Sequence, residues 1–246
     1  MKTTRTIFNT LFSALALTVC LVSCNPSDEE IDKYEGGYYV SIATVAESAD
    51  GKNYFKEDDG TTIYPTNLQS IPDSLVDSIV GKRSWFEHRI LKPEFAESGY
   101  DKTAELISFY PNVWIKSCKA ANSSEELIAF GEELIDVKYA WISGKYLNLG
   151  YQFFAADFEK HDFELVHKTY DTKDGKIHFE LCHSESDKDS SSTYFTFSSF
   201  DVSDFLPTDS KEVVFSISYQ NSLNTVKTFD VEINKDNDNT KMMSFQ

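Results

Sequence analysis

Hydrophobic and polar residues alternate along most of the chain beyond its N-terminal segment, which is the pattern of half-buried β-strands. Five segments of the first half carry it: Tyr38–Val45, Lys52–Phe55, Thr61–Tyr64, Ser84–Leu91 and Glu105–Lys116. A short helix is predicted over Ile71–Val80, which has Pro72 near its start and Gly81 after its end. Five short strands are typical of a small closed or Greek-key barrel, the OB type among them, and a small sandwich fits the same count.

The amino-acid composition changes at Lys119–Glu126, which predicts a linker, and the second half then resumes the alternation. A short helix or turn is predicted around Ser124–Gly131. Seven strand segments follow: Val137–Ser143, Lys145–Ala155, His161–Thr169, Lys176–His183, Tyr194–Phe200, Val213–Gln220 and Thr228–Ile233. Seven short strands separated by turn signals are typical of a β-sandwich. We therefore expect an all-β chain in which a small OB-like barrel precedes an antiparallel β-sandwich.

The N-terminal segment has the pattern of a secretory signal. Lys2 and Arg5 precede an apolar run over residues 11–22, which as a helix would extend only about 18 Å, short of the roughly 30 Å core of a bilayer. Leu21-Val22-Ser23-Cys24 resembles the lipobox of bacterial lipoproteins. That resemblance implies that Cys24 becomes the first mature residue and carries the acyl chains of a membrane anchor, whereas an ordinary cleaved signal would leave Cys24 unmodified.

These segments complete the predicted domain organisation. We expect a signal peptide at residues 1–23, an acidic lipid-anchored tether at 24–36, the OB-like barrel at 37–118, a linker at 119–126 and the sandwich at 127–246.

Charge narrows the choice of partners. The whole chain has 23 basic and 40 acidic side chains, a net charge of −17. Loss of the signal removes Lys2 and Arg5, which leaves 21 basic against 40 acidic residues, or −19. Such a surface repels phosphate backbones and anionic headgroups, so we expect no nucleic-acid partner and membrane contact through the lipid.

The first mature residues suggest where the protein is exported. Ser27-Asp28-Glu29-Glu30 resembles the acidic export tag of Bacteroidetes surface lipoproteins, and a solvated acidic tether is the alternative reading. Asn25 after the lipidated residue differs from the usual signal for retention at the inner membrane. These resemblances imply an outer-membrane, surface-exposed lipoprotein.

Candidate chemistry is sparse. Cys118 and Cys182 are the cysteines left after Cys20 and Cys24, and they form no zinc-type or catalytic motif. A bridge between them would close a loop of about 64 residues and contribute about 4 kcal/mol, but two free thiols are equally ordinary. His178, Cys182 and His183 cannot meet at one ion from one strand, because neighbouring residues face opposite sides. The sequence also lacks a nucleophile elbow, a phosphate loop and a dinucleotide fingerprint. We expect no enzyme, metal or cofactor.

The remaining histidines have structural interpretations. Alternation puts Ile177, Phe179, Leu181 and His183 on the core face, and we expect His183 to bond a backbone group or a carboxylate such as Asp187. His161 receives the same interpretation. The acidic loops at 185–189 and 236–239 lack the Gly and Glu of an EF-hand and are expected to be solvated.

Aromatic residues are the other resource for binding. Trp85, Trp114, Trp141, Tyr38, Tyr39, Tyr146, Tyr151, Phe153 and Phe154 lie in or beside strand patterns. Buried, they are core residues, and exposed, they could stack on sugars or anchor a protein. Phe153 and Phe154 point to opposite faces, so one of them is expected to face solvent.

Several stretches together resemble one family. They are Tyr54–Gly60, Gly81-Lys82-Arg83, Tyr100–Lys116, Trp141–Leu149, His161 to Val166, and Leu181-Cys-His183 with Asp187. With the lipobox and tether they resemble a NigD-like lipoprotein of Bacteroidetes, which implies an OB-like domain and a β-sandwich on a lipid anchor. In that arrangement a bridge from Cys118 to Cys182 would join the two domains.

Two hypotheses follow from this reading. The first is a non-catalytic envelope protein that binds a glycan or protein ligand. The second is an accessory or structural subunit that docks to an outer-membrane protein, with the bacteriocin-associated or immunity-like role that the family name suggests.

Overall fold

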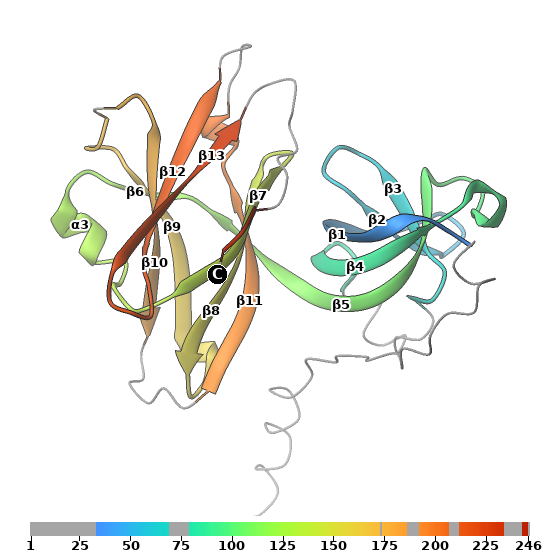
Figure 1. The fold of residues 1–246 in the computed structure, drawn as a ribbon, viewed down its shortest axis with the longest axis horizontal. Helices are drawn as coiled ribbons and strands as arrows, with labels where there is room; N and C mark the ends of the chain where they lie inside the picture. The colour runs from blue at the N-terminus through green and yellow to red at the C-terminus, as the bar shows by residue number, and fades with distance from the viewer. Residues whose placement is uncertain are drawn as a thin grey trace, which may run out of the picture. The chain divides into compact units, whose positions relative to one another are not determined.

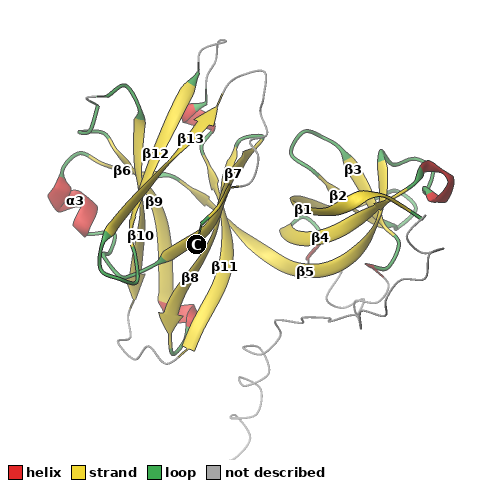
Figure 2. Cartoon of the chain, viewed as in Figure 1, coloured by secondary structure: helices red, strands yellow, loops and turns green. Residues whose placement is uncertain are grey.

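The computed structural model describes residues 33–68, 79–172, 174–185, 192–206, 212–233 and 243–245. The chain divides into two compact units, Met1–Val113 and Trp114–Gln246, which we call the barrel and the sandwich (Figure 1). Strands dominate both units, and helices are limited to short segments (Figure 2). Among the described residues, no helix is both long enough and apolar enough to cross a bilayer. The predicted signal, Cys24, the tether and most of the predicted helix at 71–80 lie outside the described residues.

The barrel is a closed ring of five strands. These are β1 (Tyr34–Glu47), β2 (Asn53–Lys56), β3 (Thr62–Pro65), β4 (Arg83–Leu91) and the first part of β5 (Lys102–Ser117). β1 pairs with β2 and β4, and β2 pairs with β3. β5 closes the ring by pairing in parallel with β3 and antiparallel with β4. The five predicted strands are present, and the closure decides for a barrel against a small sandwich.

Alternate residues of these strands fill the barrel. Phe55 and Phe86 stack at its centre with ring centroids 4.1 Å apart, and Ile63 is fully buried beside them. Because successive strand residues point to opposite faces, the same alternation that buries Phe55 and Ile63 turns Tyr54 and Tyr64 outward. The core of the barrel therefore determines which side chains its outer face displays.

The sandwich consists of two five-membered sheets. Its strands are the end of β5, β6 (Lys119–Ala121), β7 (Asp136–Ser143), β8 (Tyr146–Ala155), β9 (His161–Lys168), β10 (Ile177–Glu185), β11 (Ser192–Asp201), β12 (Val213–Gln220), β13 (Val226–Ile233) and β14 (Met243–Ser244). One sheet has the order β14-β7-β8-β11-β5 and the other β13-β12-β10-β9-β6. The predicted fold, an OB-like barrel before a sandwich, is confirmed. Within the sandwich the pairs β5–β11, β6–β9 and β10–β12 are parallel, so the expected antiparallel pairing does not hold throughout.

The predicted domain boundaries differ from the observed ones. β5 runs without interruption through the barrel and continues into the sandwich, where Trp114 pairs with Ser198 of β11. The division therefore falls after Val113 instead of at Cys118. The stretch predicted as a linker, 119–126, contains β6 and the start of helix α3 (Ser124–Ile128). The Ser and Glu residues of this stretch form the N-terminal cap of α3. The Ser123 side chain accepts a hydrogen bond from the backbone N–H of Glu126.

Candidate functional site

Three tyrosines form a contiguous aromatic cluster on the outside of the barrel. Tyr54 on β2 and Tyr64 on β3 face outward at neighbouring positions, because Phe55 and Ile63 are paired across the two strands. Tyr100, from the loop between β4 and β5, contacts both rings, with centroids 5.4 Å from Tyr54 and 5.1 Å from Tyr64. All three side chains are partly exposed. We call Tyr54, Tyr64 and Tyr100 the tyrosine face.

Hydrogen bonds between the β4–β5 loop and β3 position Tyr100. The Asp101 carboxylate accepts hydrogen bonds from the backbone N–H and the hydroxyl of Thr62, both at 2.8 Å. The Thr62 hydroxyl in turn accepts from the backbone N–H of Asp101 at 3.0 Å. These bonds from Thr62, the backbone bond first, lower the pKa of Asp101. The residue beside Tyr100 is therefore held against the strand that carries Tyr64.

A charged rim borders the tyrosine face. The Lys52 ammonium lies 5.8 Å from the centroid of the Tyr64 ring and 2.8 Å from the Glu97 carboxylate. This hydrogen bond to Glu97 raises the pKa of Lys52. Lys52 belongs to the β1–β2 loop and Glu97 to the β4–β5 loop, so the pair joins the two loops that flank the aromatic rings.

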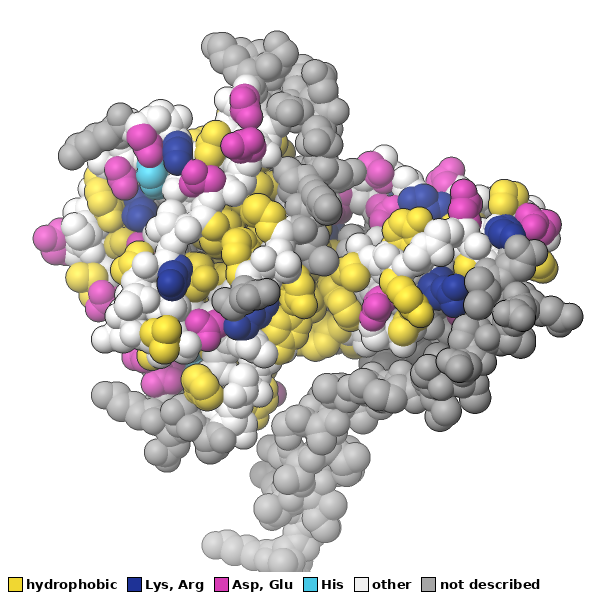
Figure 3. Space-filling view, in the orientation of Figure 1, with side chains coloured by type: hydrophobic (Ala, Val, Ile, Leu, Met, Phe, Trp, Pro, Cys, Tyr) yellow, Lys and Arg dark blue, Asp and Glu magenta, His cyan; other side chains and the backbone are white. Residues whose placement is uncertain are grey.

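The arrangement is suited to binding rather than to covalent chemistry. Strands 2 and 3 with the flanking loops 1–2 and 4–5 are the face that OB-folds use for oligonucleotides and oligosaccharides. Aromatic rings provide stacking surfaces, and an adjacent ammonium and carboxylate can hydrogen-bond hydroxyl groups. The net charge of −17 disfavours an oligonucleotide. On the side of the molecule shown in Figure 3, Lys and Arg are scattered among acidic residues without forming one basic patch.

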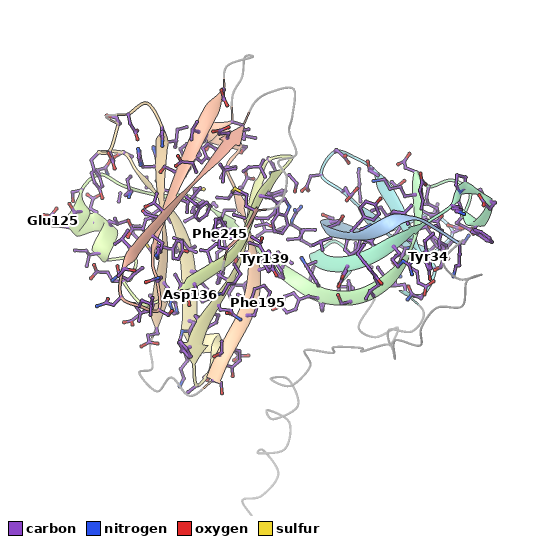
Figure 4. The ribbon with its side chains drawn as sticks, viewed as in Figure 1. Tyr34, Glu125, Asp136, Tyr139, Phe195 and Phe245 are labelled. Atoms are coloured by element: carbon purple, nitrogen blue, oxygen red, sulfur yellow. The ribbon has the colours of Figure 1, made fainter. Side chains whose placement is uncertain are left out.

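A second concavity lies in the sandwich. A cleft of about 370 Å³ opens between β7, β13 and the C-terminal β14. Asp136, labelled with Phe245 in Figure 4, lines it and also lines a smaller neighbouring hollow of about 170 Å³. The cleft has mixed walls, with Lys138 and Lys227 as its cations and Phe229 and Phe245 as its apolar surface. The rings of Phe229 and Phe245 contact each other in this cleft, with centroids 4.7 Å apart.

The two buried histidines of the sandwich, His161 and His183, have structural partners. His183 lies on the core face, as predicted, with Phe179 and Leu181. Its Nδ1 lies 3.0 Å from the Leu134 carbonyl oxygen and its Nε2 lies 2.8 Å from Nδ1 of His161. The predicted bond to a backbone group is confirmed, while Asp187 lies outside the described residues. His178, in contrast, contacts Asp174 near the start of β10. The described part of the chain contains no group of three His, Cys, Asp or Glu residues that could hold a metal ion.

The predicted alternative of a Cys118–Cys182 bridge is wrong for this structure, in which both thiols are free. Cys118 packs against the core between the sheets and lies 3.3 Å from the carbonyl oxygen of Asp201. Cys182 points to the other side of its sheet, where it joins a cluster with Val166 under α3. Burial raises the pKa of each thiol to about 12. The two side chains lie on opposite sides of β10, which excludes a bond between them here.

Most of the aromatic residues singled out from the sequence belong to cores. Trp141, Tyr151 and Phe153 are buried, and Trp114 packs against the sandwich core. Phe154 is 49% exposed beside the buried Phe153, which confirms that one of the two faces solvent. The tyrosine face was missed, although the alternation in Lys52–Phe55 and Thr61–Tyr64 contained the signal for its two strand residues.

Comparisons with known proteins identify the sandwich. Residues 117–233 match the family model for the NigD-like C-terminal beta sandwich domain. A comparison with curated proteins gives no match.

Several solved structures resemble the whole fold. A Bacteroides vulgatus protein of unknown function is 20% identical with a TM-score of 0.65, over 85% of this chain and 96% of that chain. A NigD-like immunity protein from Bacteroides caccae is 14% identical with a TM-score of 0.57, over 82% of this chain and 99% of that chain. A Bacteroides fragilis candidate lipoprotein is 15% identical with a TM-score of 0.51, over 80% of this chain and 98% of that chain. The sandwich is therefore a NigD-like C-terminal beta sandwich domain.

Proposed function

We propose that this protein is a non-catalytic lipoprotein of the cell envelope, anchored in the outer membrane through Cys24 and exposed at the surface, that binds a glycan on the tyrosine face of its barrel. The observation that carries the proposal is the contact of Tyr100 with both Tyr54 and Tyr64 on the face where OB-folds bind oligosaccharides.

The chemistry of the tyrosine face favours a sugar. The apolar faces of a pyranose ring stack on aromatic side chains, while its hydroxyl groups need donors and acceptors at the edge. Lys52 and Glu97 supply both beside Tyr64. Lys52 also lies 3.7 Å from Asp50, so the rim carries two carboxylates for one ammonium and does not favour an anionic ligand.

The proposed lipid anchor is supported by the lipobox-like sequence and by a similar solved structure. The resemblance of residues 21–24 to a lipobox gives the site of lipidation, and the similar Bacteroides fragilis structure is a candidate lipoprotein. Export to the cell surface rests on the acidic residues that follow Cys24.

A polysaccharide screen tests the glycan site. The chain from Asn25 onward retains every described residue and is incubated with an array of bacterial and host polysaccharides. Tyr64→Ala should weaken the affinity for the retained polysaccharide by roughly 2- to 12-fold, since an aromatic contact contributes about 0.5–1.5 kcal/mol. Phe154→Ala is the matched control, because it removes a partly exposed ring from the sandwich. The proposal fails if no polysaccharide is retained, or if Tyr64→Ala binds as the parent chain does.

A second function is favoured by a different observation. Among the described residues, β13 pairs with β12 alone and ends its sheet, and Val226 and Leu223 beside it are 64% and 77% exposed. An open edge strand with apolar neighbours is a template for docking a protein strand. The similarity to a NigD-like immunity protein from Bacteroides caccae suggests a protein partner of this kind.

Cross-linking in intact cells tests the docking role. The anchored chain should capture one envelope protein in near-equal amount, whereas the Cys24→Ala form should lose it. Val226→Lys should also abolish capture, because a charge at the open edge opposes strand addition. Capture that survives Val226→Lys would contradict docking at β13.

A further inference from the structure

The first described strand begins close, along the chain, to the residue that would carry the lipid. Cys24 precedes Lys33 by nine residues, which span at most about 30 Å when fully extended. Tyr34, labelled in Figure 4, is the first residue of β1. An anchor at Cys24 would therefore keep the start of β1 within about 30 Å of the bilayer surface.

A bulge displays aromatic residues at this end of β1. Glu35 pairs with Ile90 and Tyr39 with His88, so three residues of β1 lie opposite Arg89 alone. Gly36 lies in this bulge with φ +76°, where an added Cβ would come 2.6 Å from the Tyr39 hydroxyl oxygen. Tyr38, Tyr39 and Val40 are exposed by 68%, 44% and 38%.

A cation is fixed against the aromatic rings. The guanidinium carbon of Arg89 lies 3.5 Å from the centroid of the Tyr34 ring and 5.4 Å from that of Tyr38. The Tyr34 hydroxyl donates a hydrogen bond to Glu105 at 2.9 Å, and the Lys33 ammonium pairs with the same carboxylate oxygen. We call Tyr34, Tyr38, Val40 and Arg89 the β1 patch, since the Tyr39 ring lies toward the buried His88 on the other face of the strand.

We propose that the β1 patch lies in the headgroup region of the membrane that holds the lipid anchor. This inference rests on the lipidation of Cys24 in the proposed function. Tyrosine prefers the boundary between water and hydrocarbon, because its ring is apolar and its hydroxyl is polar. Arginine extends its charge to phosphates from the same depth. The β1 patch combines these groups at the end of the barrel nearest to the anchor along the chain.

Site-specific fluorescence tests the orientation. An environment-sensitive dye is attached to the lipidated protein at Tyr38→Cys or, as the matched control, at Leu223→Cys in the sandwich. Both positions are highly exposed, and the native thiols have raised pKa values that disfavour labelling. The protein is reconstituted in vesicles of phosphatidylethanolamine with a minor share of phosphatidylglycerol and of lipid carrying a quencher at headgroup depth.

The expected result is a blue shift and a loss of intensity for the dye at position 38, with neither at position 223. Protein that floats with the vesicles but shows an unquenched dye at position 38 overturns the membrane contact while leaving the anchor intact. Protein that does not float overturns the anchor and this inference together. Glycan binding by the tyrosine face is measured separately on the unanchored chain, so its failure is distinguishable from both.

Discussion

Nδ1 of His161 lies 2.8 Å from Nε2 of His183 inside the sandwich, and Nδ1 of His183 lies 3.0 Å from the carbonyl oxygen of Leu134. Since a carbonyl can only accept, His183 donates from Nδ1 and its Nε2 accepts from His161. Nε2 of His161 is buried without a hydrogen-bond partner among the described residues. This arrangement of hydrogen bonds holds the His183 ring in its neutral form, in agreement with its lowered pKa.

This pairing predicts a loss of stability in mild acid. Burial first, and the neighbouring His161 in addition, lower the pKa of His183 to about 4 in the folded chain. The unfolded state, with a pKa near 6.5, binds a proton that the folded state excludes, so stability falls as the pH drops from about 6.5 toward 4. The free energy of unfolding should decrease by about 2 kcal/mol between pH 7 and pH 5 from this group.

Urea denaturation at the two pH values measures the effect. His183→Gln should be less stable than the parent chain at pH 7 and should show a smaller difference between pH 7 and pH 5. An unchanged difference in the variant would contradict the assignment to His183. His88 in the barrel has its pKa lowered to about 4, first by burial and then by Lys102, so part of the pH dependence should persist.

A buried ion pair supports the β2–β3 hairpin. The Arg83 guanidinium bonds the two carboxylate oxygens of Asp58 at 2.5 and 2.9 Å, and the Arg83 side chain is 1% exposed. Asp58→Asn should cost about 1.5–3 kcal/mol, because the two charge-assisted hydrogen bonds from Arg83 lose their carboxylate acceptor. Chemical denaturation checks this against Asp230→Asn, which breaks a surface pair with Lys176 and should change stability little. Equal effects of the two substitutions would count against the buried pair.

A close backbone approach requires glycine at position 131. Gly131 has φ +109°, and a Cβ there would lie 2.3 Å from the carbonyl oxygen of His183. Gly131→Ala should destabilise the sandwich by about 3 kcal/mol or more, since backbone strain and steric overlap act together. Gly175→Ala is the control, with φ +76° and open space around the added carbon, and should cost about 1–2 kcal/mol. Thermal unfolding of the two variants distinguishes strain alone from strain with overlap.

The free thiols predict resistance to modification. Burial raises the pKa of Cys118 and Cys182 to about 12, so the reactive thiolate is scarce at pH 8. A maleimide should label neither residue in the folded chain and both after denaturation without reductant. Absence of labelling in the denatured, unreduced chain would reveal a disulfide. A reductant should leave the melting temperature unchanged.

The alternation of residues predicted the strands well, because burial on one face of a sheet requires a period of two. It placed His183 on the core face with Phe179 and separated Phe153 from Phe154. It misplaced the domain boundary, because the strand pattern of β5 continues unchanged from one side of Val113 to the other. At that point the pairing partners of β5 change from β3 and β4 to β11. The alternation within β5 does not indicate this change, because the partners are distant in the sequence.

The sequence by itself therefore determined the all-β class, the strands, the acidic charge and the signal pattern at the N-terminus, since each depends on residues near one another in the chain. Tertiary structure decided the closure of the barrel, the separation of Cys118 from Cys182, the pairing of His161 with His183 and the assembly of the tyrosine face. Tyr54 and Tyr64 are neighbours because β2 pairs with β3 in a hairpin, and Tyr100, 36 residues beyond Tyr64, joins them only because Thr62 binds Asp101. Local patterns specify which face a side chain occupies, whereas the contacts that join distant segments arise only when the chain closes on itself.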